Sequence, residues 1–155
     1  MINIIIFLVI SLIYNGYIIW KYGVPVSLSE TAYLLGGNKR YWFTAYCYIS
    51  AFLILPMLFN IVPETLTFLP FIMCTGLIFS GASPLFKEGL DKPVHMVASI
   101  MAFIACVIFI ILFMGWWWFA LFVAGLLGLC LWKRNCYIYF AEILAFLFIS
   151  VFILI

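Results

Sequence analysis

The chain has 155 residues, of which 70% are hydrophobic, 21% aromatic and only 8% charged. An average soluble domain carries about 25% charged residues, so this composition excludes a soluble globular protein. The net charge of +2 is too small, and the basic residues are too dispersed, to indicate binding to nucleic acid. The length allows about six bilayer crossings at roughly 20 residues each, which leaves almost nothing for a separate aqueous domain. We therefore expect a single integral membrane domain over residues 1–155.

Six continuous apolar segments follow one another along the chain, separated by its only polar stretches. They cover residues 2–20, 41–60, 64–83, 94–114, 116–132 and 136–155. Continuous runs favour helices over strands, because the strands of a membrane barrel alternate between apolar and polar side chains. The first segment lacks a basic leading region and is long enough to span, so we interpret it as a retained helix. The expected fold class is all-α, a polytopic membrane helical bundle with six transmembrane helices.

The positive charges fall in alternate connections between these segments, which places all of them on one side of the predicted membrane. They are Lys21, Lys39, Arg40, Lys87, Lys92, Lys133 and Arg134. The positive-inside rule makes that side cytoplasmic, so we expect a multi-pass protein of the cytoplasmic (inner) membrane with both termini outside. Aromatic belts would then place Trp20, Trp42 and Trp132 at the inner interface and Trp116, Trp117 and Trp118 at the outer one. A five-span alternative, fused around Gly115, would break the charge pattern, so we expect a tight turn there.

The first connection, VPVSLSETAYLLGGNKR, is the only long one. Ser27 and Glu30 have the spacing of a capping box, and Gly36 and Gly37 would end the helix that follows. The pattern predicts a short interfacial helix over residues 28–35 that lies flat on the inner leaflet. Its role would be that of a plain amphipathic connector or of a gate or partner-docking element.

Glu142 is the most chemically informative side chain, because it lies about two turns into the sixth segment with no Lys or Arg near it in sequence. An acidic side chain at the centre of a membrane helix costs about 2.5 to 3.5 kcal/mol, so such groups are protonated, paired or directed into a wet cavity. Polar residues of the same leaflet come from other segments. The candidates for a polar pocket open to the cytoplasm are Glu142, His95, Ser99, Asn15, Ser80 and Ser83.

Each of these residues also has a purely structural interpretation. Glu142 is near the cytoplasmic third of its helix, where snorkelling lowers the cost of a charge, and Ser and Asn often form interhelical hydrogen bonds. A single His near an interface often caps a helix or contacts a head group. Glu142 and His95 are placed in the same leaflet, about 7 Å apart in depth, so a direct or water-bridged contact between them is feasible. If the fourth and sixth helices are neighbours, the pair would titrate as one coupled unit.

Catalytic motifs are missing from the sequence. One histidine cannot build a multi-His zinc site, and neither a Ser-His-acid set nor a phosphate-binding Gly-rich loop has recognisable spacing. We therefore expect no enzyme, no catalytic residues, no metal and no cofactor.

Small residues recur at helical spacing in three places, and these ridges permit close helix contact. They are Ala98, Ala102 and Cys106, then Gly76 with Ser80, and Ala124 with Gly128. Packing within one bundle and self-association both explain them. The expected partners are the lipid bilayer and either a membrane protein or a second copy of the chain.

Three stretches, YGVPVSLSETAYLL, FLILPMLF and GLIFSGASPLFKEGLDKPVHMVASIMAF, resemble segments of small, uncharacterised multi-span membrane proteins found in gut bacteria and their phages. The resemblance covers residues 22–103 and implies a multi-span integral membrane protein without naming an activity. The motif positions in this chain are Ser27, Ser29, Gly81, Pro84 and His95.

The sequence leaves three classes of function open. The first is a small channel, transporter or ligand-binding bundle with a cytoplasm-facing polar pocket, which the intramembrane Glu142 and the polar residues of the same leaflet favour. The second is a structural or accessory subunit of a larger complex, or a phage-type membrane-active or exclusion protein. The third, a lipid-modifying enzyme, has the least support because no catalytic motif is present.

Overall fold

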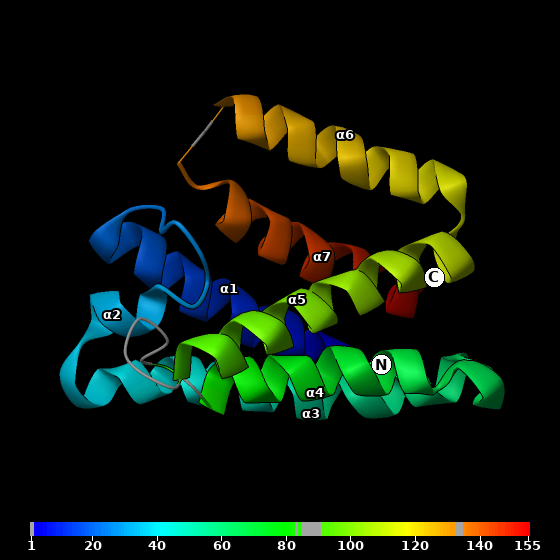
Figure 1. Cartoon of the computed structure of the whole chain (residues 1–155), viewed down its shortest axis with the longest axis horizontal. Coiled ribbons are helices and arrows are strands. Elements are labelled where there is room, and N and C mark those ends of the chain that lie inside the picture. The colour runs from blue at the N-terminus through cyan, green and yellow to red at the C-terminus, as the bar shows by residue number, and fades with distance from the viewer. Residues whose placement is uncertain (1, 83, 85–90, 133–134) are drawn as a thin grey trace.

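The computed structural model describes residues 2–82, 84, 91–132 and 135–155, and the regular elements in these ranges are helices (Figure 1). The long helices are α1 (Ile2–Tyr22), α3 (Tyr41–Ile61), α4 (Phe68–Ala82), α5 (Asp91–Phe109), α6 (Trp116–Trp132) and α7 (Tyr137–Leu154). The shorter ones are α2 (Thr31–Leu35), the 3-10 turns Gly37–Arg40 and Glu64–Leu66, and the π-helical turn Ile110–Met114 that extends α5. The predicted all-α fold class is confirmed.

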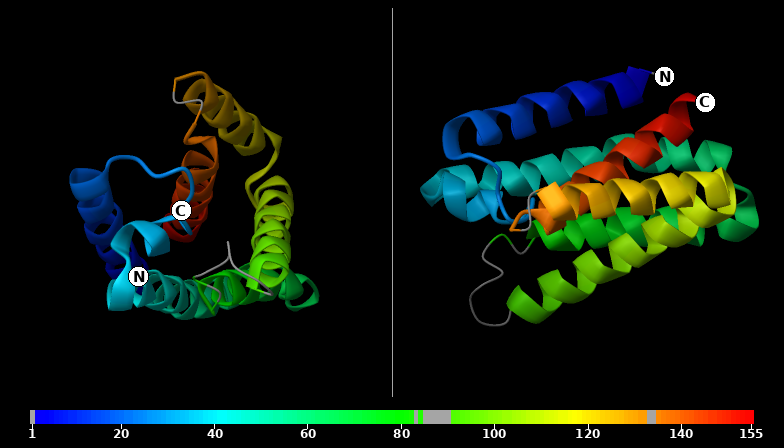
Figure 2. Two further views of the ribbon diagram at one scale, coloured as in Figure 1. Left: turned by 60° about the vertical axis from the view of Figure 1, so that its left-hand side comes forward. Right: turned by 90° about the horizontal axis from the view of Figure 1, so that it is seen from above.

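The six long helices run alternately up and down, so that the two termini lie at the same end of the bundle (Figure 2). The cations in the described ranges lie at the opposite end, next to the ends of α1, α3 and α5: Lys21, Lys39, Arg40 and Lys92. The other three basic residues that were predicted at this end, Lys87, Lys133 and Arg134, are outside the described residues. Trp20, Trp42 and Trp132 share the cation end, because α1 and α6 end there and α3 begins there.

The number of expected spans is only partly supported. Within the described ranges, five helical stretches are long and apolar enough to cross a membrane: Ile2–Tyr22, Gly37–Ile61, Glu64–Ala82, Lys92–Met114 and Tyr137–Leu154. The remaining predicted span, residues 116–132, corresponds to α6, which is apolar but has only 17 residues.

Gly115 makes the tight turn that the charge pattern requires. Its φ of 87° is in the left-handed region that favours glycine. The chain reverses direction at this residue, between the π-helical turn and α6 (Figure 2). A single fused helix around Gly115 is therefore excluded.

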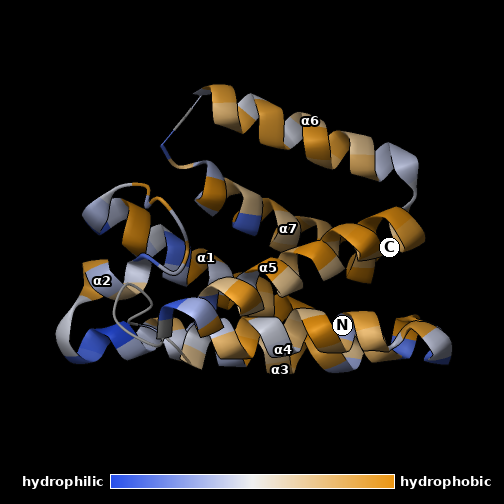
Figure 3. Cartoon of the chain, viewed as in Figure 1, coloured by the Kyte–Doolittle hydropathy of each residue, from blue (hydrophilic) through white to orange (hydrophobic). Residues whose placement is uncertain are grey.

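Apolar side chains cover the outside of the bundle as well as its core. Figure 3 shows hydrophobic colouring along the lengths of the helices, with hydrophilic residues concentrated towards their ends. Trp117 is 86% exposed and Leu131 is 89% exposed. Contiguous apolar surface of this extent is rare on a soluble protein and is the surface that lipid chains cover.

Close helix contacts in the core use the small residues. A Cβ added at Gly76 of α4 would lie 2.6 Å from the carbonyl oxygen of Ala98 and 2.8 Å from the Cβ of Ala102, both on α5. A Cβ at Gly81 would lie 2.6 Å from the Cβ of Cys47 on α3. The ridges on α4 and α5 thus pack against each other inside one bundle, which was one of the two interpretations of their spacing.

Candidate functional site

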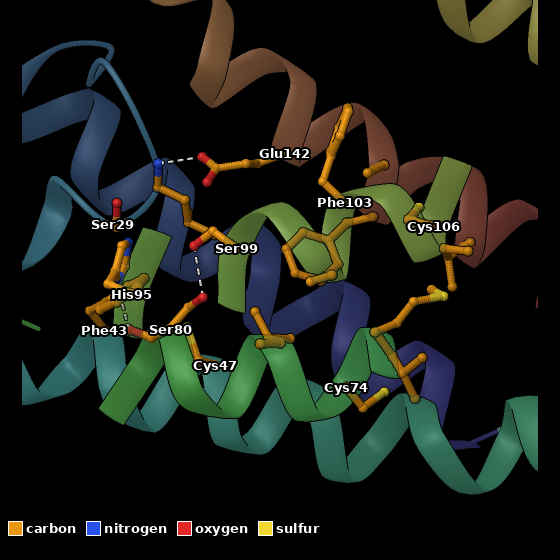
Figure 4. Close-up of a pocket in the computed structure, with 18 residues that line it drawn as sticks. Ser29, Phe43, Cys47, Cys74, Ser80, His95, Ser99, Phe103, Cys106 and Glu142 are labelled. Carbon is orange, nitrogen blue, oxygen red and sulfur yellow. Dashed lines mark hydrogen bonds between the residues drawn. The ribbon is translucent and has the colours of Figure 1, made fainter. Parts of the chain in front are cut away.

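A cavity of about 120 Å³ lies inside the bundle between α3, α4, α5 and α7 (Figure 4). It is lined by Leu28, Ser29, Phe43, Cys47, Ile54, Met73, Cys74, Leu77, Ser80, His95, Ser99, Ala102, Phe103, Cys106, Glu142, Ala145, Phe146 and Ile149. Its two ends differ in chemistry. Figure 4 shows the labelled serines, His95 and Glu142 towards one end, with Cys74 and Cys106 towards the other.

Glu142 reaches the polar end of this cavity from α7. It lies five residues after Tyr137, the first residue of α7, which corresponds to about 7.5 Å along the helix. Its Oε2 accepts a hydrogen bond of 2.6 Å from the backbone N–H of Leu28. A carboxylate has about four lone-pair sites, so this single bond leaves acceptor capacity at the cavity.

His95 and two serines form the opposite wall of the polar end. His95 is only 3% exposed, and its Nδ1 lies 3.0 Å from the carbonyl oxygen of Ser80. Because a carbonyl oxygen only accepts, Nδ1 carries the proton in this contact. The hydroxyls of Ser80 and Ser99 are 2.8 Å apart and link α4 to α5. Glu142 and His95 therefore hydrogen bond to different groups, although both line the same cavity.

The segment over residues 24–35, which we call the covering segment, lies across the polar end. It is fastened to the start of α7, where the N–H of Tyr139 donates to the carbonyl of Val26 over 3.0 Å and the thiol of Cys136 lies 3.5 Å from the carbonyl of Val24. The bond from Leu28 to Glu142 is a third link. These contacts bring the first connection against the last helix of the described chain.

The predicted interfacial helix differs from the observed one in length and burial. The helix α2 spans Thr31–Leu35 rather than residues 28–35, and Leu28 and Ala32 are 3% and 1% exposed. The expected capping contact is present, since Ser27 Oγ accepts from the N–H of Glu30 over 3.2 Å. The reciprocal bond is shifted by one residue, because Glu30 Oε2 accepts from Val26 N–H instead of Ser27 N–H. Leu28, Ala32 and Leu35 of the segment are buried against the end of the bundle, whereas Val26 is exposed.

Apolar and aromatic groups make up the rest of the cavity wall. Phe43, Phe103 and Phe146 come from α3, α5 and α7. The remaining apolar lining includes Met73, Cys74, Cys106 and Ile149. A cavity with a few polar groups at one end and an apolar body is the usual form of a small-molecule site.

Four of the six predicted pocket residues line the cavity: Glu142, His95, Ser99 and Ser80. Ser83 is outside the described residues. Asn15 does not line it, because its side chain is engaged elsewhere. Asn15 Oδ1 accepts from the hydroxyl of Tyr139 over 2.9 Å, and its Nδ2 donates to the carbonyl of Ser11 over 2.8 Å.

Ser29 and the amide of Leu28 are site groups that the pocket prediction missed. The capping box placed them in an ordered segment, and Ser29 is a motif position of the resemblance, but neither signal indicates contact with α7. Among the described residues no group of three or more His, Cys, Asp or Glu side chains could hold a metal ion.

Comparisons with protein family models, with curated proteins and with solved structures found no match.

Proposed function

We propose that the protein is a six-span integral protein of the cytoplasmic membrane that binds a small ligand in the cavity between α3, α4, α5 and α7. Both termini would lie outside, and the cation end of the bundle would face the cytoplasm. The cavity's polar end is nearer the cation end, so ligand would enter from the cytoplasmic side beneath the covering segment. The proposal includes channels and transporters, in which the bound ligand also crosses the membrane.

Two features support six spans in spite of the shortness of α6. Its 17 residues extend over about 25 Å, which is within the observed lower range for transmembrane helices. The alternating direction of the helices also supports a sixth span, because α6 runs from the end of the bundle where α5 finishes to the end where α7 begins (Figure 2).

The observation that carries the proposal is the convergence of Glu142, His95, Ser80 and Ser99 from three helices on one cavity. Buried polar groups cost free energy unless they are satisfied, and a bundle that needed only packing would fill this space with apolar side chains. A volume of about 120 Å³ holds about four waters at roughly 30 Å³ each, or one small organic molecule.

Thermal unfolding of the protein in lipid nanodiscs tests ligand binding. A panel of small polar and amphipathic compounds is compared on the native chain and on Ala145→Leu, which fills the cavity. A ligand of the cavity raises Tm of the native chain and leaves Tm of the filled variant unchanged. Ala120→Leu on the exposed surface of α6 is the matched control. If no compound raises Tm of the native chain selectively, the binding proposal fails.

An accessory subunit is the second candidate, and α6 favours it. Phe122 is the one buried residue among the described positions of this helix, which packs mainly against α7 and the π-helical turn. Figure 1 shows α6 at the edge of the bundle. Purification in mild detergent would support this role if a larger membrane protein of fixed stoichiometry accompanied the chain.

A further inference from the structure

The polar end of the cavity is rich in hydrogen-bond acceptors. Glu142 contributes a carboxyl group of which only Oε2 has a protein donor in the described structure. The hydroxyls of Ser29, Ser80 and Ser99 accept as well as donate. A ligand that brings several N–H donors is complementary to this set.

No Lys or Arg side chain of the described residues lines the cavity, and the Nδ1–H of the histidine that does, His95, is directed to the carbonyl oxygen of Ser80. Lys21, Lys39 and Lys92 are all exposed at the end of the bundle. An ionised carboxylate in an apolar environment is stable only when a positive charge or several donors pair with it. A cationic ligand supplies that charge, and its presence favours the ionised form of Glu142.

Three phenyl rings line the cavity, those of Phe43, Phe103 and Phe146. Figure 4 shows Phe43 beside His95 at the polar end and Phe103 farther from it. Aromatic faces attract ammonium groups electrostatically, and they also pack well against an apolar ligand body. The same cavity therefore offers an acid and aromatic rings for a positively charged head, followed by apolar wall for the remainder of the molecule.

The volume limits the size of the ligand. A cavity of 150 Å³ in an engineered soluble protein is known to bind benzene, and the cavity here is about 120 Å³. The cavity here is about a fifth smaller, so a group of one ring or a short chain is the largest that it can enclose, and a phospholipid does not fit.

We propose that the cavity binds a small amphipathic organic cation, a protonated primary amine attached to an apolar group of about one ring, with its ammonium group on Glu142. This assignment rests on the proposed ligand-binding function and names the class of ligand. The apolar group would extend past Phe103 towards Met73 and Cys106.

Benzylamine is a suitable probe, and benzyl alcohol is its neutral counterpart of nearly the same shape. The affinity for each compound is measured from the dependence of Tm on its concentration in nanodiscs. The same series on the filled variant Ala145→Leu gives the change in Tm that comes from partition of the compound into lipid, and this change is subtracted. Benzylamine is expected to bind the native chain at least about tenfold more tightly than benzyl alcohol, since loss of a paired buried charge costs a factor of this size or more.

Glu142→Gln removes the charge and keeps an oxygen that can accept from Leu28 N–H. It is expected to weaken benzylamine binding by about tenfold or more and to leave benzyl alcohol binding unchanged. Glu64→Gln, on an exposed residue at the opposite end of the bundle, is the matched control and keeps native affinity for both compounds. If Glu142→Gln does not fold, the comparison of benzylamine, benzyl alcohol and benzoate on the native chain still decides the ligand class.

The outcomes separate the two proposals. Equal binding of benzylamine and benzyl alcohol to the native chain, abolished by Ala145→Leu, overturns the cationic ligand and keeps the binding cavity. Tighter binding of benzoate than of benzylamine also overturns it. Absence of binding by every probe and by the wider panel overturns the proposed function itself.

Discussion

Gly76 shows how one hydrogen atom in place of a side chain sets the distance between two helices. The backbone of α4 approaches α5 so closely at this position that any Cβ would meet Ala98 and Ala102 at less than 3 Å. The groups it would meet are a backbone oxygen and a short side chain, neither of which can rotate away. Helix separation, rather than a side-chain rotamer, would have to change.

We predict that Gly76→Ala destabilises the bundle by about 1–3 kcal/mol, the usual cost of overpacking a core. The measurement is reversible or kinetic thermal unfolding in detergent. Gly16→Ala on α1 is the matched control, because no atom apart from the neighbouring backbone of α1 lies within 4 Å of the point that its Cβ would occupy, and alanine is the better helix former. A Gly76→Ala variant as stable as the native chain would contradict the close α4–α5 contact.

The sequence indicated which polar residues line the site better than it indicated the groups to which they hydrogen bond. Glu142 stood out because a lone acid in an apolar run is costly wherever it points. Asn15 is also polar and was predicted in the same leaflet, yet its side chain hydrogen bonds to Tyr139 and does not line the cavity. Sequence periodicity gives the height of a residue in the membrane but not its angular position relative to neighbouring helices, which tertiary packing decides.

The covering segment is the element whose environment differs most from expectation. Its capping box correctly indicated a turn at Ser27 that leads into a helix. Its apolar residues were expected to face lipid, because an amphipathic helix on a membrane and one packed against protein have the same pattern. The hydrogen bonds between this segment and α7 show that it packs against protein. They join residues more than 100 positions apart, so the local sequence pattern does not indicate them.

Cross-linking tests the docked position of this segment. The thiol of Cys136 lies 3.5 Å from the carbonyl of Val24, so Val24→Cys is expected to form a disulfide with Cys136 under mild oxidation. The assay counts thiols that react with a maleimide polymer after denaturation, and oxidation should remove two. The variant that also carries Cys136→Ser should lose none. Retention of both thiols in Val24→Cys would show that the segment lies elsewhere.

At the scale of the whole molecule, the direction of the helices determines which connections share a side. We predict that Lys39 and Glu64 lie on opposite sides of the membrane, with Lys39 in the cytoplasm, since they flank α3 at its two ends. Both residues are exposed, so their replacement by cysteine places a label without disturbing the core. Glu64 is preferable to Gly115 for this purpose because its backbone does not need a positive φ.

The side of the membrane on which each residue lies is measured by labelling intact cells with a membrane-impermeant maleimide. In a background with Cys130 and Cys136 changed to serine, Glu64→Cys is expected to react from outside and Lys39→Cys only after the membrane is opened. The native Cys47, Cys74 and Cys106 are buried and serve as the unreactive baseline. Strong external reaction at position 39 would reverse the orientation.

The segmentation of the chain was accessible from sequence because spanning helices need a long apolar run and their connections need polar residues. Five of the predicted segments contain helices that meet the length and hydropathy of a span, and the turn at Gly115 is present. The arrangement of those helices around a cavity was not accessible. Nearly all faces of these helices are apolar, so the sequence does not distinguish a face covered by lipid from a face covered by protein.

The bond between Leu28 and Glu142 joins two residues 114 positions apart, and this separation has a consequence for biosynthesis. At a translation rate of about 5–20 residues per second, Glu142 is made roughly 6–23 s after Leu28. Throughout that interval the covering segment has no α7 to receive its backbone groups, and the cavity lacks one wall. The segment can therefore dock only after α7 has been made. A chain cut short before Cys136 would leave the N–H of Leu28 and the carbonyl oxygens of Val24 and Val26 without these partners.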